Sequence, residues 1–231
     1  MIKIRVLKIK TLLQVQKYKI NVNKVLLFLI FLLILYQISD FTAYFFKKRF
    51  MKEIKLKDKS FRLSMSENDI LARVKAVADQ INKDYEGRRP LFLSVLNGAF
   101  MFTSDLMKEI SIDCEISFVK LASYQGTMST GHVHEVIGVN EDLHGRDIII
   151  VEDIVESGRT MLQMLDSLAN RHPASIKVCT LFYKPSKLVE KSVHVDYVAI
   201  EIPDDFIVGY GLDYDQLGRN LRDIYTIVPE E

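Results

Sequence analysis

Cysteine is scarce in this chain, and the motifs that cysteine would support are missing. The two cysteines, Cys114 and Cys179, give neither a disulfide framework nor zinc-ligand spacing. Both lie in apolar, strand-like runs, so we expect buried structural thiols of the kind found in a reducing cytosol. A P-loop signature, internal repeats and a long linker are also missing from the 231 residues, which argues against a P-loop nucleotidase and favours a single domain.

Net charge is almost absent overall, but its distribution is uneven. Of the 31 Lys and Arg and 30 Asp and Glu, ten basic residues and one acid lie in residues 1–50. The other 181 residues therefore carry 21 basic and 29 acidic side chains. Such an acidic body argues against nucleic-acid binding, and an anionic ligand would need a local site or a metal ion.

The first fifty residues contain the one long hydrophobic run. Residues 25–46 hold a single charge, Asp40, and are long enough to cross a membrane as a helix. No small-residue cleavage site follows, as a secretory signal would require. The flanking basic residues would place the acidic body outside the cell. We therefore prefer a mis-assigned start before Met51, and keep a membrane tether through residues 25–46 as the alternative.

Residues 51–231 alternate between strand and helix patterns. Ser66 with Asp69 three residues later indicates a helix N-terminus. The apolar positions that follow at helical spacing are Ile70, Val74, Val77, Ala78 and Ile81. Strands are expected at residues 91–96, 115–121, 147–151, 176–183 and 195–200, with helices between them. This alternation predicts an α/β domain with a mostly parallel central sheet.

The most informative stretch is residues 148–161, IIIVEDIVESGRTM. Ile148 to Val151 predict a strand buried on both faces. Glu152 and Asp153 follow where the strand is expected to end, which is where open α/β sheets bind ligands. Residues 157–160 then open a helix, whose backbone N–H groups and positive end suit a phosphate. The residues of that helix expected to face the core are Met161, Leu165, Leu168 and Ala169.

This stretch resembles the phosphoribosylpyrophosphate (PRPP) signature of type I phosphoribosyltransferases. With the motifs below, residues 51–231 resemble the hypoxanthine and hypoxanthine-guanine members of that family. The resemblance implies a mostly parallel sheet flanked by helices with a small hood, preceded here by an extra hydrophobic N-terminal helix. It also implies purine salvage, in which the phosphoribosyl group of PRPP is transferred to hypoxanthine, and to guanine, giving IMP or GMP and pyrophosphate.

The resemblance assigns the PRPP contacts to the signature itself. Glu152 and Asp153 would hold the ribose hydroxyls, and a general base would act at Glu156. The family usually has Asp at this last position, so the reach of the carboxylate differs here by ~1.5 Å. The 5′-phosphate contacts would come from Ser157, Gly158, Arg159 and Thr160.

Further motifs match the family's pyrophosphate, metal and purine sites. Asn97 and Gly98 match the pyrophosphate loop, in which the family often has Lys at the first position and a cis peptide. Lys184 matches the lysine that donates to O6 of a 6-oxopurine, a role that fits its donor-only chemistry. The remaining matches are Arg219 to pyrophosphate, Phe206 and Ile207 to the purine, Asp213 with Glu152 and Asp153 to Mg²⁺, and Ser123 with Tyr124 to a mobile loop.

The resemblance also implies partners and leaves one rival function. The family predicts a cytoplasmic homodimer or homotetramer that binds PRPP, a 6-oxopurine and Mg²⁺. A regulatory protein of the same fold that senses PRPP without catalysis is the alternative. The matches at Lys184, Phe206, Asp213 and Arg219 together argue against it, because a sensor of PRPP would not need the whole purine pocket.

Overall fold

The computed structural model describes residues 52–123 and 133–229, which contain two β-sheets. The larger has six strands in the order β5-β4-β3-β6-β7-β8. Strands β4, β3, β6, β7 and β8 are parallel to their neighbours, and β5 joins antiparallel to β4. The strands are β3 (Leu91–Leu96), β4 (Glu115–Ser123), β5 (Val133–Ile137), β6 (Asp147–Val155), β7 (Ser175–Tyr183) and β8 (Tyr197–Glu201).

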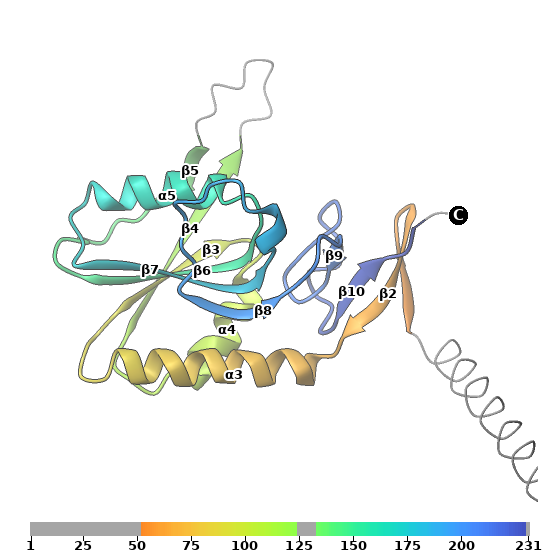
Figure 1. The fold of residues 1–231 in the computed structure, drawn as a ribbon, viewed down its shortest axis with the longest axis horizontal. Helices are drawn as coiled ribbons and strands as arrows, with labels where there is room; N and C mark the ends of the chain where they lie inside the picture. Colours follow the sequence, from red (N-terminus) through yellow and green to blue (C-terminus); the bar gives the residue numbers. More distant parts are fainter. Residues whose placement is uncertain (1–51, 124–132, 230–231) are drawn as a thin grey trace, which may run out of the picture. The chain divides into compact units, whose positions relative to one another are not determined.

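Helices cover both faces of this sheet (Figure 1). The helices α3 (Glu67–Asp84) and α4 (Phe100–Glu109) pack against one face, and α5 (Arg159–Ala169) packs against the other. A short 3-10 helix, η1 (Pro185–Lys187), follows β7. The mostly parallel sheet flanked by helices that the alternating pattern predicts is confirmed.

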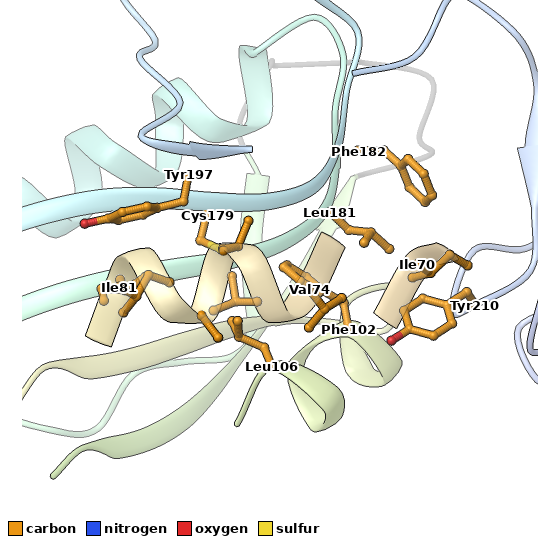
Figure 2. Close-up of a cluster of buried hydrophobic side chains, with 14 of the residues drawn as sticks. Ile70, Val74, Ile81, Phe102, Leu106, Cys179, Leu181, Phe182, Tyr197 and Tyr210 are labelled. Atoms are coloured by element: carbon orange, nitrogen blue, oxygen red, sulfur yellow. The ribbon is translucent and has the colours of Figure 1, made fainter. Parts of the chain in front are cut away.

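The helix α3 begins where its sequence indicates. Ser66 has extended backbone angles, and its hydroxyl accepts a hydrogen bond from the backbone N–H of Asp69 at 3.3 Å. All five apolar positions expected to face the core are buried. Figure 2 shows three of them, Ile70, Val74 and Ile81, in one cluster with side chains of α4, β7 and β8.

The strand β6 separates two hydrophobic cores. Ile148 and Ile150 belong to the core under α5, whereas Ile149 and Val151 belong to the core under α3 and α4. All four are fully buried, because successive side chains of a strand point to opposite faces. A strand buried on both faces is therefore confirmed.

Three details of the sequence interpretation are wrong. The strand β6 continues to Val155, because Ile154 and Val155 extend the β-branched run beyond the acids. On α5, Met164 is buried and Ala169 is exposed, because Met164 lies one turn after Met161 and Ala169 is the last residue of the helix. Cys114 is only partly buried. Cys179 is buried as expected, and burial raises the pKa of its thiol.

The smaller sheet forms the hood that the resemblance implies. Its strands run antiparallel in the order β1-β2-β10-β9, and the pattern of the sequence did not identify them individually. Phe61, Val208 and Tyr225 form its small core. The strands are β1 (Glu53–Leu56), β2 (Lys59–Met65), β9 (Ile207–Val208) and β10 (Ile224–Ile227).

The hydrophobic extension and its expected helix lie outside the described residues. Within residues 52–123 and 133–229, no helix is long and apolar enough to cross a membrane.

Candidate active site

A cavity of about 350 Å³ lies at the carboxyl end of β6. It brings together five of the site residues that the sequence singles out, from Glu152 in β6 to Thr160 in the first turn of α5. Its lining consists of Val95, Leu96, Glu152, Ile154, Val155, Glu156, Ser157, Gly158, Thr160 and Met161.

The two acids of β6 are crowded together. The backbone N–H of Asp153 donates to Glu152 Oε1 at 3.3 Å, and that of Ile154 donates to Asp153 Oδ1 at 2.9 Å. Burial, and then the neighbouring Asp153 carboxylate, raise the pKa of Glu152 well above its usual value. Two adjacent carboxylates favour a ligand that brings hydroxyl donors or positive charge.

The entry to α5 has the backbone geometry of a tight phosphate-type turn. Gly158 has a φ of 79°, a backbone conformation that glycine adopts without strain and other residues rarely adopt. A Cβ there would also lie 2.9 Å from Leu188 Cδ1. The Ser157 hydroxyl accepts from the backbone N–H of Arg159 at 3.4 Å. The Arg159 side chain does not line the cavity; its Nε lies 3.9 Å from Glu190 Oε1. Of the four residues assigned to the 5′-phosphate, Ser157, Gly158 and Thr160 line the cavity and Arg159 does not.

Two glycines bring the pyrophosphate loop against the acids and the hood. A Cβ on Gly98 would lie 1.6 Å from Asp153 Oδ2, and one on Gly211 would lie 2.1 Å from the carbonyl oxygen of Gly98. The peptide bond between Leu96 and Asn97 is cis, as the resemblance implies. The loop after β3, the end of β6 and the segment after β9 therefore meet at one point.

Asp213 and Arg219 lie on the segment that contains Gly211. Arg219 Nη2 lies 2.5 Å from Asp213 Oδ1, and Arg219 Nη1 donates to the Gly211 carbonyl oxygen at 2.8 Å. The other carboxylate oxygen of Asp213 accepts from the backbone N–H of Gln216 at 2.8 Å. The residues expected to contact pyrophosphate and Mg²⁺ thus form an ion pair next to the Gly98 loop.

Glu156 and Lys184 form an ion pair at the edge of the cavity. Lys184 follows β7, its backbone N–H donates to the Val155 carbonyl oxygen at 3.0 Å, and its ammonium contacts the Glu156 carboxylate. Lys184 is only 4% exposed. The expected proton acceptor and the expected O6 donor therefore lie together, although they are 28 positions apart in the sequence.

The remaining purine and loop residues are less closely connected. Phe206 is 45% exposed, as expected for a stacking face, and its ring centroid lies 6.2 Å from that of Phe61 and 5.9 Å from that of Tyr214. Ile207 is buried and pairs with Thr226 of β10. Ser123 is the last residue of β4, and Tyr124 lies outside the described residues.

No ready-made metal cage is present in the described part of the chain, where no three His, Cys, Asp or Glu side chains gather as ligands. Glu152 and Asp153 offer hard oxygen ligands from one side, and Asp213 offers them from the hood segment. This donor set suits Mg²⁺, which keeps several waters and is usually held jointly by one or two carboxylates and substrate phosphates.

Sequence reasoning missed Asp204 and Gly211. Asp204 Oδ1 lies 3.7 Å from Lys184 Nζ, and Gly211 touches Gly98. Both lie in the segment whose spacing resembles the family, but only the folded chain shows what they touch. A pair of acids before Phe206, at residues 204 and 205, was the available signal for the first.

Comparison with known proteins agrees with this geometry. A family model described as "Phosphoribosyl transferase domain" matches residues 66–215, so the chain belongs to the phosphoribosyl transferase family. A Streptococcus pyogenes hypoxanthine-guanine phosphoribosyltransferase is 44% identical over 161 residues, which cover 69% of this chain and 89% of that protein. Within the family, the chain groups with the hypoxanthine-guanine phosphoribosyltransferases.

Two further relatives support that grouping. A Mycobacterium tuberculosis hypoxanthine-guanine phosphoribosyltransferase is 40% identical over 172 residues, covering 71% of this chain and 85% of that protein. A crystal structure of a hypoxanthine-guanine phosphoribosyltransferase from Bacillus anthracis matches with a TM-score of 0.68 and 36% identity. The match covers 72% of this chain and 98% of the other.

Proposed function

We propose that this protein is a purine-salvage enzyme that transfers the phosphoribosyl group of PRPP to hypoxanthine, and to guanine, with release of pyrophosphate. The observation that carries the proposal is the ion pair of Glu156 with the buried Lys184 at the edge of the signature cavity. A carboxylate and a donor-only ammonium side by side suit the N–H and the 6-oxo group of one purine edge.

The reaction forms one bond and breaks one. A ring nitrogen of the purine attacks C1 of the ribose as the bond from C1 to the pyrophosphate oxygen breaks, and the nitrogen's proton passes to Glu156. Lys184 donates to O6, Phe206 supplies a stacking face and Ile207 offers backbone groups to the purine edge. Closure of the loop that begins at Ser123 and Tyr124 would exclude water from the charged ribose.

Binding of PRPP is divided among the other matched residues. Glu152 and Asp153 hold the ribose hydroxyls, Asn97 and Gly98 offer backbone groups to pyrophosphate, and Arg219 adds bidentate donors. Bound Mg²⁺ would be held by Asp213, Glu152 and Asp153 and would neutralise the leaving pyrophosphate. The phosphate contacts come from the turn into α5, that is from Ser157, Gly158, Arg159 and Thr160.

The proposal includes the enzyme's setting. We assign catalysis to residues 51–231. The enzyme would act in the cytoplasm as a homodimer or homotetramer, and it would not bind nucleic acid. A membrane association would require residues 25–46. The PRPP-sensor alternative finds no support, since the relatives reported above are named as transferases.

A pyrophosphate-release assay tests the function. The purified full-length protein is incubated with PRPP, Mg²⁺ and one base at a time. Hypoxanthine and guanine are expected to release pyrophosphate, and adenine, which lacks a 6-oxo group, is not. Pyrophosphate release with adenine but with neither hypoxanthine nor guanine, or release without any base, would contradict the proposal.

A further inference from the structure

The ammonium of Lys184 has two carboxylate neighbours on different elements. Glu156, the residue after β6, contacts it directly, and Asp204, after β8, has its Oδ1 at 3.7 Å. Lys184 is buried, whereas both carboxylates are about half exposed. The lysine therefore relies on these two side chains for its counter-charge.

Asp204 is itself anchored by a second lysine. Lys187 Nζ lies 2.6 Å from Asp204 Oδ2, and the backbone N–H of Lys187 donates to the Lys184 carbonyl oxygen at 3.0 Å. The hydrogen bond from Lys187 lowers the pKa of Asp204, with a smaller contribution from Lys184. Two lysines and two acids thus form one cluster with no net charge.

The proposed reaction gives Glu156 two duties that conflict. In the unliganded protein it balances Lys184, but during transfer it must turn to the purine N–H. A buried ammonium that loses its partner is strongly destabilised. Asp204 is the acid in contact with Lys184 that has no part in the proton transfer.

We propose that Asp204, held by Lys187, is a positioning residue for purine recognition that balances and orients Lys184 when Glu156 turns to the purine. The inference rests on the proposed function. Asp204 acts through Lys184 and need not touch the substrate. Its loss should therefore weaken the use of the purine and leave the use of PRPP intact.

The test compares Asp204→Asn with Asp205→Asn in the full-length protein. Asp205 is the adjacent exposed acid, so its substitution removes the same charge from the same segment. For Asp204→Asn, the KM for hypoxanthine should rise about tenfold, as expected for a lost charged contact. The KM for PRPP and the Tm should match those of Asp205→Asn, and Asp204→Glu should restore part of the loss.

A double-mutant cycle separates positioning from a general structural effect. In a Lys184→Gln background, Asp204→Asn should have almost no further effect on hypoxanthine use, because the group it positions is gone. An equal tenfold loss in both backgrounds would overturn the inference. If Asp204→Asn does not fold, Lys187→Met takes its place. We expect a smaller rise in the KM for hypoxanthine, and the absence of any rise would overturn the inference.

The two proposals fail in different ways. A wild-type protein that does not convert hypoxanthine overturns the proposed function and this inference with it. An active wild type whose Asp204→Asn variant keeps the normal KM for hypoxanthine overturns the role of Asp204 alone.

Discussion

Charged side chains lie at both ends of the strands of the main sheet, here called the amino edge and the carboxyl edge. The charges are arranged differently at the two edges. Near the amino ends of the strands, a cavity of about 410 Å³ is lined by Gln80, Asp84, Tyr85, Arg88, Lys177, Asp196 and Tyr197. Lys177 Nζ lies 2.7 Å from Asp196 Oδ1, and the Tyr197 hydroxyl donates to Asp84 Oδ2 at 3.0 Å. The carboxyl edge instead places Glu152 beside Asp153 and raises the pKa of Glu152.

The difference separates stability from function. The opposite charges that meet at the amino edge support the fold. The carboxyl edge has ion pairs too, Glu156 with Lys184 and Asp213 with Arg219, but it adds the crowded carboxylates of Glu152 and Asp153. Like charges that crowd together gain from a ligand, and such perturbed groups tend to mark functional sites. Substitutions at the carboxyl edge should therefore change activity, and those at the amino edge should change the free energy of unfolding.

The largest expected effect is at Glu156. Glu156→Gln should lower kcat ~10²–10⁴-fold, because it removes the proton acceptor, and should leave PRPP affinity intact. Glu156→Asp, the usual family residue, should keep or raise kcat. Steady-state kinetics and PRPP titration measure both. A loss in Glu156→Asp as large as that in Glu156→Gln would show that the loop requires the longer side chain.

Gly98→Ala should have the next largest effect. The added Cβ would lie 1.6 Å from Asp153 Oδ2, so the acid or the loop must move, and misplacement of this kind can cost ~10²-fold in kcat/KM for PRPP. Gly145→Ala is the matched control, because nothing lies within 4 Å of its Cβ. Its positive φ should cost about 1–2 kcal/mol of stability without loss of activity. Equal kinetics for the two variants would contradict the close approach.

At the amino edge, Arg88→Met should lower the free energy of unfolding by about 1 kcal/mol with unchanged kcat. The hydrogen bond from Arg88 lowers the pKa of Asp147 below its usual 3.8. A lowered acid pKa stabilises the fold above the unfolded value, and this stability is lost as pH falls through the folded pKa. Urea unfolding at several pH values should show a difference between variant and wild type that is full at pH 7 and shrinks below about pH 4.

Removal of residues 1–50 should have the smallest effect on catalysis. The site residues assigned above all lie within residues 97–219, and the family match begins at residue 66. We expect unchanged kcat and KM for the shortened protein in the pyrophosphate-release assay. A tenfold loss of kcat/KM would assign these residues a part in the site.

Local patterns predicted the five parallel strands of the main sheet and the helices between them, but not the antiparallel strand β5 (Val133–Ile137) or the hood. Ser66 and the apolar spacing after it located α3, and the run at residues 148–151 located the central strand. The hood strands are short and pair residues far apart in sequence, such as Phe61 with Ile227, so the resemblance rather than a local pattern predicted them. The contact of Asp204 with Lys184 depends on where β8 ends beside β7, which one sequence does not state.

The neutral cluster around Lys184 has a consequence for how substrate binding responds to ionic strength. Its two lysines and two acids sum to zero, and a purine base brings no charge, so added salt has little net attraction to screen when the base binds. PRPP is strongly anionic and binds where Arg219 and Mg²⁺ would meet it. Raising the salt concentration should therefore raise the KM for PRPP well before it changes the KM for hypoxanthine.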